Sequence, residues 1–297
     1  MSDLRTEQQN PEVPVIIIER DDEEVKAVSP SLGRRRTWWR WAVAALVALA
    51  CVAALLAWYE NYKENRVGIP ISTTPTQNIE MLKQAAKAEP AQVVMSSDSI
   101  LGVALDFYAL HGLKASLQFE EPDTADASVY LYSRCADHMA DGNFIGSLVA
   151  DGKTLQDDRS RLGYMAMADG RMVIGVSRSD KVKDYVVERG GSFFRQFILV
   201  SNGVIPTRFY LHGKVERRAI GRMGDTLYYI ATRHKESLWD FADALREFGF
   251  VDAIYLTGGN RRSFYRSVDG ERHDIGTDDG SRHGNGENRI AWLVFRK

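Results

Sequence analysis

Residues 237–259 read SLWDFADALREFGFVDAIYLTGG and predict a helix followed by a strand that ends in a pair of glycines. Ser237 can cap the helix, since the acidic residue Asp240 follows three positions later. Four apolar side chains recur with helical spacing, namely Leu238, Phe241, Leu245 and Phe248. Gly249 provides a C-terminal stop, and the apolar run after it has the length of a strand. The unit predicts that the chain combines helices with a sheet.

Four two-residue turns separate further β-rich runs in the same half of the chain. They are Asp151-Gly152, Asp169-Gly170, Asn202-Gly203 and Asp269-Gly270. Asn-Gly and Asp-Gly favour the positive φ that tight hairpins need, so each turn predicts a β-hairpin. Other strand-like runs lie at Ser128–Ser133, Phe209–Leu211, Thr226–Thr232 and Trp292–Arg296. Together these runs predict a mostly antiparallel sheet.

Three further segments have helical character. Asp180–Glu188 begins with a capping residue, Thr76–Glu89 ends before a proline, and Ile100–Leu110 is a third candidate. Helices are thus fewer than strands. The expected fold class is α+β, a mostly antiparallel sheet with a few packed helices, preceded by one transmembrane helix.

The transmembrane prediction rests on residues 41–59, WAVAALVALACVAALLAWY, which contain no charged residue. At about 1.5 Å per residue such a helix spans about 28 Å, close to the thickness of a bilayer core. Aromatic residues mark both ends, as is typical of membrane interfaces: Trp38, Trp39 and Trp41 at one end, Trp58 and Tyr59 at the other. A cleaved signal peptide is the competing interpretation, but its apolar core is normally shorter and is followed by small residues.

The charges around this segment predict its orientation. Four arginines precede it, Arg34, Arg35, Arg36 and Arg40, whereas the charges that follow nearly cancel. Positive charge is retained on the cytoplasmic side, so the N-terminus is expected there. We therefore expect a disordered cytoplasmic tail (1–36), an anchor (37–60), a juxtamembrane linker with a short helix (61–92) and an extracytoplasmic domain (93–297), periplasmic in a Gram-negative cell.

Composition excludes several classes of protein. With 44% hydrophobic and 26% charged residues the chain is globular on average, and its net charge of -2 does not indicate a nucleic-acid partner. Cys51 lies in the apolar segment and Cys135 beyond it, so the two cannot pair within one chain, and we expect Cys135 to be buried. The short motifs of zinc proteases, dithiol redox sites, hydrolase elbows and phosphate-binding loops are absent from the sequence.

Two stretches are candidate anion-binding sites. Val251–Arg262 contains the Gly258-Gly259 pair, whose main-chain amides can approach an anionic ligand closely, although a plain turn with solvated arginines is the alternative. In Lys214–Gly221, Arg217 and Arg218 would point to opposite faces of a strand, so that one can face inward and bind a phosphate. A surface strand with alternating charge is the alternative there.

The order of four stretches resembles the phosphodiester glycosidase domain. This is the catalytic domain of the lysosomal enzyme that uncovers mannose 6-phosphate by removing N-acetylglucosamine from a phosphodiester, and it is found in many bacterial proteins. The stretches are NFIGSLVADGK (143–153), FILVSNG (197–203), RRAIG (217–221), similar to the family's R-T-A-I-G, and the unit 237–259, similar to a family stretch ending A-L-N-L-D-G-G-G-S. The resemblance covers residues from about 140 to 262.

The resemblance implies that Arg217 and the amides of Gly258 and Gly259 bind phosphate, with Asn260 and Arg261 near the leaving group. The chain departs from the family at Thr257, which replaces an aspartate and cannot act as a base near pH 7. Secondary candidates for the same pocket are His212, Arg134, Asp137 and Arg195. The attacking group and the proton donor stay unassigned; no metal or cofactor is assigned, and a divalent cation is left open.

Three functions stay open at this point. The first is a membrane-anchored, extracytoplasmic hydrolase acting on a sugar-phosphodiester in an envelope glycan or polysaccharide of a bacterial cell. The second is a catalytically inactive domain of the same fold that binds a glycan or another anion. The third is a structural component of envelope assembly. A carboxylate beside Arg217 would favour the first, and a site with no carboxylate for proton transfer would favour the second.

Overall fold

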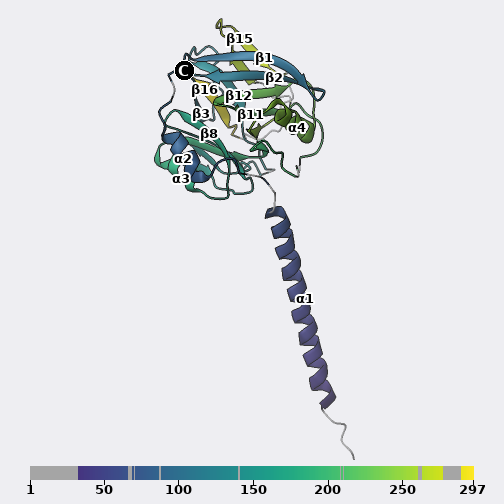
Figure 1. Cartoon of the computed structure of the whole chain (residues 1–297). Coiled ribbons are helices and arrows are strands. Elements are labelled where there is room, and N and C mark those ends of the chain that lie inside the picture. Colours follow the sequence, from purple (N-terminus) through teal and green to yellow (C-terminus); the bar gives the residue numbers. More distant parts are fainter. Residues whose placement is uncertain are drawn as a thin grey trace, which may run out of the picture. The chain divides into compact units, whose positions relative to one another are not determined.

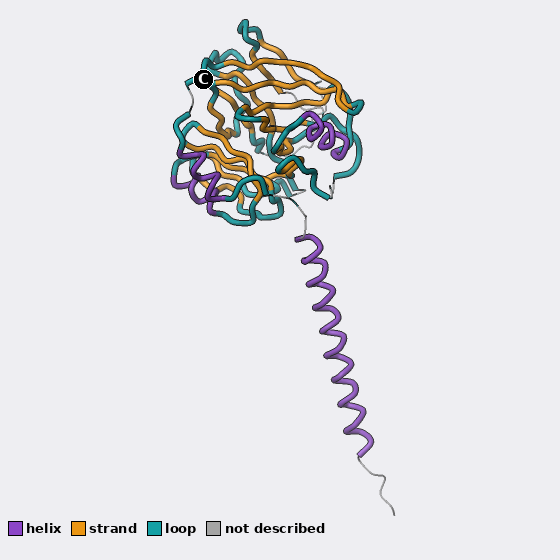
Figure 2. Tube along the Cα trace, viewed as in Figure 1, coloured by secondary structure: helices purple, strands orange, loops and turns teal. Residues whose placement is uncertain are grey.

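The computed structural model describes residues 33–65, 69, 71–86, 88–139, 141–207, 209, 211–259, 263–276 and 289–297. The chain forms two compact units, residues 1–63 and 64–297. The described ranges contain four helices and sixteen strands (Figure 1, Figure 2). The helices are α1 (Gly33–Asn65), α2 (Pro75–Lys83), α3 (Lys181–Glu188) and α4 (Leu238–Phe248).

Helix α1 contains the apolar segment predicted from the sequence. Its 22 residues Trp38–Tyr59 have a mean hydropathy of 2.4, and none of them is buried. A helix of this length and composition can cross a bilayer. It is a candidate membrane span or signal sequence.

The sixteen strands form three sheets in which every recorded pair of strands is antiparallel, so the predicted α+β class is confirmed. The six-stranded sheet has the order β1 (Gln92–Ile100), β2 (Val103–His111), β12 (Thr226–Thr232), β11 (Arg218–Met223), β13 (Asp252–Leu256), β10 (Ile198–Ser201). One five-stranded sheet has the order β15 (Arg272–Ile275), β14 (Ser263–Arg266), β4 (Val129–Arg134), β16 (Trp292–Arg296), β3 (Lys114–Gln118). The other has the order β6 (Lys153–Gln156), β5 (Leu148–Ala150), β9 (Ser192–Gln196), β7 (Gly163–Ala168), β8 (Arg171–Val176).

The predicted Asn-Gly and Asp-Gly turns have the backbone geometry that their residue types favour. The non-glycine residues Asp151, Asp169 and Asn202 have φ values of 47°, 53° and 51°, and each is followed by a glycine with positive φ. Two of these turns join β5 to β6 and β7 to β8, and the third closes a short bridge from Ser201 to Val204. The fourth turn lies between β14 and β15, where only Gly270 has positive φ.

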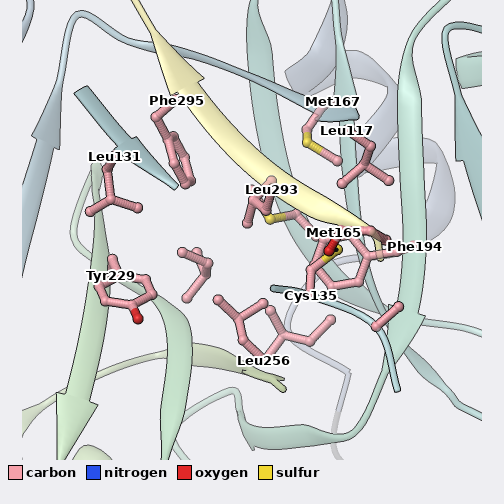
Figure 3. Close-up of a cluster of buried hydrophobic side chains, with 14 of the residues drawn as sticks. Leu117, Leu131, Cys135, Met165, Met167, Phe194, Tyr229, Leu256, Leu293 and Phe295 are labelled. Carbon is pink, nitrogen blue, oxygen red and sulfur yellow. Dashed lines mark hydrogen bonds between the residues drawn. The ribbon is translucent and has the colours of Figure 1, made fainter. Parts of the chain in front are cut away.

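The central core lies between the three sheets, each of which contributes one apolar face. Figure 3 shows Leu293 and Phe295 of β16 among Leu131, Met165 and Phe194. Cys135 belongs to this cluster and is 0% exposed, which confirms the burial expected of it. The opposite face of the six-stranded sheet is covered by α4, which follows from the predicted helical stripe of apolar residues.

Helices α2 and α3 lie together against the sheet that contains β7 and β8 (Figure 1). Leu82 of α2 and Val186 of α3 are buried there. Asn78, also on α2, is buried and donates a hydrogen bond from Nδ2 to Tyr164 Oη at 2.6 Å. The segment predicted as a juxtamembrane helix is therefore packed on the sheet, and it ends at Lys83, six residues before the predicted end.

Two sequence predictions were wrong. Ile100–Leu110, a candidate helix, is the end of β1, a turn at Leu101-Gly102 and strand β2. Both faces of β2 are buried, Phe107 against α4 and Tyr108 in the central core, so its apolar run is nearly continuous and lacks the alternation of a half-buried strand. Phe209 and Leu211, predicted to lie in a strand, are outside any strand; residues 208 and 210 are outside the described ranges.

Candidate functional site

The pairing of β11 with β13 brings Arg217 and the glycine pair to one edge of the six-stranded sheet. Arg218, the first residue of β11, lies opposite Leu256, the last residue of β13. Arg217 therefore lies beside the residues that follow β13. The Gly259 N–H donates to the carbonyl of Glu216 at 2.8 Å, which extends the pairing past the end of the strands.

Arg217 is buried, with 2% of its surface exposed. Its Nε donates to the Glu236 carbonyl at 2.9 Å, and Nη2 donates to the Gly213 carbonyl at 2.7 Å. Nη1 donates to the hydroxyl of Tyr255 at 3.5 Å. All three acceptors are neutral, and no carboxylate of the described residues forms an ion pair with this guanidinium.

The other two arginines that are buried among the described residues have carboxylate partners. Arg218 contacts Glu216 at 3.4 Å, and Arg195 contacts Asp180 at the same distance. A buried charge is costly unless it is paired, so Arg217 differs from both in a way that suits an anionic ligand.

The two glycines are required for different reasons, Gly258 by close packing and Gly259 by its backbone conformation. A Cβ on Gly258 would lie 2.3 Å from the Glu216 carbonyl oxygen, closer than real Cβ contacts come. The Gly258 N–H donates to Tyr255 Oη at 3.1 Å, so the tyrosine hydroxyl accepts from both this amide and Arg217. Gly259 has a φ of +84°, which few other residues adopt.

Asp137 supplies a carboxylate near this hydroxyl. Its Oδ2 accepts a hydrogen bond from Gln196 Nε2 at 3.0 Å. The main-chain carbonyl of Phe197, the residue after Gln196, accepts the Tyr255 N–H at 2.8 Å. This hydrogen bond links the end of β9 to β13. Burial raises the pKa of Tyr255, and the negative charge of Asp137 raises it further, whereas Arg217 acts in the opposite direction. Tyr255 therefore keeps its proton at neutral pH.

Arg161 is a second cation in this region. Its guanidinium carbon lies 4.0 Å from the centre of the Phe197 ring, and that ring contacts Tyr255 edge-on at 6.4 Å. Burial lowers the pKa of Arg161, and the charge of Asp137 acts against this effect. We call the cluster of Asp137, Arg161, Arg217, Tyr255 and Gly258 the Arg217 site.

The remaining candidates from the sequence have other environments. Arg195 is held by the carbonyls of residues 161, 177 and 179 and by Asp180, so its guanidinium supports the loops around it. Arg134 lies over the Trp292 ring at 5.2 Å, and His212 is exposed. Asn260 and Arg261 are outside the described residues.

Thr257 replaces the family aspartate immediately before Gly258. Its Oγ1 is buried and has no hydrogen-bond partner within the described part of the chain. A bound ligand or water would give this hydroxyl a partner. No cluster of three or more histidine, cysteine, aspartate or glutamate side chains that could hold a metal occurs in the described ranges.

Comparison with protein families gives this site a context. The model of the phosphodiester glycosidase family matches residues 136–291, more than half of the 297 residues. The chain belongs to the phosphodiester glycosidase family. The matched range contains all five members of the Arg217 site, including Asp137 near its beginning. A search of curated proteins gave no significant match.

Two solved structures share the fold of this phosphodiester glycosidase family member. One is the catalytic domain of zebrafish N-acetylglucosamine-1-phosphodiester alpha-N-acetylglucosaminidase, auto-inhibited by pro-peptide, with 13% identity, a TM-score of 0.51, and coverage of 73% of this chain and 86% of that chain. The other is a hypothetical protein from Synechocystis, with 9% identity, a TM-score of 0.52, and coverage of 71% and 64%. At these identities the likeness concerns the fold alone.

Sequence reasoning found three members of the Arg217 site and missed two. Arg217, Gly258 and Asp137 were candidates, whereas Arg161 and Tyr255 were not. One signal for Tyr255 was present, since the phosphodiester glycosidase stretch A-L-N-L-D-G-G has asparagine where this chain has Tyr255. Arg161 lies in a polar loop between β6 and β7, and no sequence pattern there indicates its contact with Phe197.

Proposed function

We propose that the protein hydrolyses a sugar-phosphodiester at the Arg217 site. The observation that carries this proposal is the buried Arg217 guanidinium, which has no carboxylate partner among the described residues and lies beside the Gly258 amide. A phosphate diester carries one negative charge and oxygens that accept from both groups. Arg161 adds positive charge to the same region.

Asp137 is the proposed proton-transfer group. In this reaction a water oxygen forms a bond to the anomeric carbon, and the bond between that carbon and the phosphate oxygen breaks. The water proton passes to Asp137, and the phosphate leaves as a monoester. Gln196 orients the carboxylate through its hydrogen bond to Oδ2, and Arg217 with the Gly258 amide stabilises the departing phosphate.

An inactive binding domain is the second candidate, and Thr257 favours it. The family aspartate at this position is replaced by a hydroxyl that cannot take up a proton at neutral pH. Such a domain would bind the same diesters through Arg217 and release no sugar. Measuring binding and sugar release on the same samples therefore separates the two functions.

The test uses the full-length chain in detergent micelles and the 1-(methyl phosphodiesters) of glucose, galactose, mannose and N-acetylglucosamine. Arg217→Ala is expected to weaken binding by about 10-fold or more, because a hydrogen bond to a charged group contributes about 1.5–3 kcal/mol. Arg233→Ala is the matched control, since this exposed arginine pairs with Asp106. Calorimetry measures binding, and thermal unfolding confirms that each variant is folded.

Each result has one interpretation. Sugar release that Arg217→Ala loses supports the hydrolase. Binding that depends on Arg217 without sugar release assigns the chain to the second function. If folded wild-type protein neither binds nor cleaves any diester, the proposal is wrong.

We also propose that the domain is extracytoplasmic and acts on an envelope glycan. The arginines before the apolar segment support an N-terminus in the cytoplasm. In spheroplasts of a Gram-negative host, a membrane-impermeant maleimide is expected to label Lys297→Cys at the exposed C-terminus. Cys135 gives no background because it is buried and burial raises the pKa of its thiol. Ser2→Cys should react only after the membrane is permeabilised; the reverse pattern contradicts the orientation.

A further inference from the structure

Tyr255 joins the two hydrogen-bond donors of the Arg217 site. It lies in β13, is 4% exposed, and accepts the Gly258 N–H at 3.1 Å and Arg217 Nη1 at 3.5 Å through one hydroxyl oxygen. The Arg217 guanidinium carbon is also 5.9 Å from the centre of the tyrosine ring. Among the described residues, the guanidinium of Arg217 donates to two main-chain carbonyls and to one side-chain oxygen, the Tyr255 hydroxyl.

These donors are also those that a phosphate would need. The Gly258 amide has a single proton and cannot donate fully to the tyrosine oxygen and to a phosphate oxygen at once. We infer that the Tyr255 hydroxyl occupies the place of a phosphate oxygen and competes with a bound phosphodiester for Arg217 and the Gly258 amide. This inference rests on the proposed function and adds to it a residue that limits affinity.

Energetics favour competition in which the phosphate displaces the hydroxyl. Hydrogen bonds that involve an ionised acceptor are roughly twice as strong as neutral ones, so an anionic oxygen is the better partner for a buried guanidinium. The hydroxyl still accepts from Arg217 Nη1 and the Gly258 amide in the unliganded protein, where these two donors would otherwise lack a partner among the described residues. Removing the hydroxyl oxygen should thus destabilise the free protein slightly and strengthen ligand binding.

In the opposite role, the Tyr255 hydroxyl donates a hydrogen bond directly to the ligand. Tyr255 keeps its proton, since burial and Asp137 both raise its pKa, and a protonated hydroxyl can donate to a phosphate oxygen. The two roles predict opposite effects of the same substitution. Without the hydroxyl oxygen, affinity rises if Tyr255 competes and falls if Tyr255 donates.

The experiment compares full-length wild type, Tyr255→Phe, Tyr229→Phe and Arg217→Ala in detergent, with inorganic phosphate and the four methyl phosphodiesters as probes. Tyr255→Phe is expected to bind about 5–10-fold more tightly than wild type, because a typical hydrogen bond contributes about 1 kcal/mol. Tyr229→Phe is the matched control, since its buried hydroxyl donates to Ser263 Oγ at 3.0 Å, and its affinity should equal that of wild type. Thermal unfolding confirms folding, and Tyr255→Leu carries the same test if Tyr255→Phe does not fold.

The outcomes separate this inference from the proposed function. Tighter binding by Tyr255→Phe, with binding still lost in Arg217→Ala, supports it. Equal or weaker binding by Tyr255→Phe, while wild type binds through Arg217, overturns the inference and leaves the proposed function intact. If neither wild type nor Tyr255→Phe binds any probe, both are wrong.

Discussion

Replacing Asp137 by asparagine is expected to lower sugar release about 1,000-fold while changing diester affinity less than 3-fold. A positioned acid or base contributes about 10²–10⁴-fold to a rate, and an asparagine at this position would keep the size and the hydrogen-bonding capacity of the side chain without taking up a proton. We choose Asp137 because its negative charge raises the pKa of both Tyr255 and Arg161 in the Arg217 site. The measurement is the rate of sugar release from each diester.

Asp141→Asn is the matched control for this substitution. Asp141 lies in the same loop, is exposed, and accepts hydrogen bonds from Asn143, which lower its pKa. Its replacement should leave sugar release within 2-fold of wild type. If Asp137→Asn keeps more than a third of the wild-type rate of sugar release, Asp137 is not the proton-transfer group, and another group accepts the water proton.

Local chemistry explains which parts of the fold were predictable. The Asp169-Gly170 hairpin depends on residues that adopt positive φ, and helix α4 depends on a cap, an apolar stripe and Gly249. Each of these signals lies within thirteen consecutive residues or fewer. The division of sixteen strands among three sheets does not, because β4 pairs with β16, which is more than 150 residues away in the chain.

The same contrast between local sequence signals and long-range pairing applies to the candidate site. Arg217 and Gly258 could be proposed together because the order of motifs implied them, and the antiparallel pairing of β11 and β13 then brought them to one edge. Tyr255 was not a candidate, since it lies inside the apolar run predicted as a strand and nothing local distinguishes it from a core residue. Its role depends on the direction of its hydroxyl, which is set by Arg217 and the Gly258 amide and not by the alternation of the strand.

Arg218→Met is expected to destabilise the domain by about 3–5 kcal/mol, the cost of removing one partner of a buried ion pair. Arg218 is 0% exposed; it donates to Ser263 Oγ at 3.2 Å and to the Ile275 carbonyl at 3.5 Å, and it pairs with Glu216. Gly276 makes room for it, because a Cβ there would lie 2.2 Å from Arg218 Nη2. Methionine keeps much of the volume and removes the charge, so the unpaired Glu216 carboxylate causes most of the loss. Urea unfolding followed by circular dichroism measures the free energy of unfolding.

A second substitution tests that cause. Adding Glu216→Gln to Arg218→Met removes the unpaired charge and should recover about 1 kcal/mol or more, because replacing both partners avoids an uncompensated buried carboxylate. Arg233→Ala breaks an exposed pair with Asp106 and should cost less than about 1 kcal/mol. A loss below about 1 kcal/mol in Arg218→Met, or no recovery in the double variant, would show that packing and not charge pairing determines stability at this position. Glu216 also accepts the Gly259 N–H through its main-chain carbonyl. If Arg218→Met causes a large loss in the free energy of unfolding, we expect that the Arg218–Glu216 pair also holds the glycine turn of the Arg217 site in place.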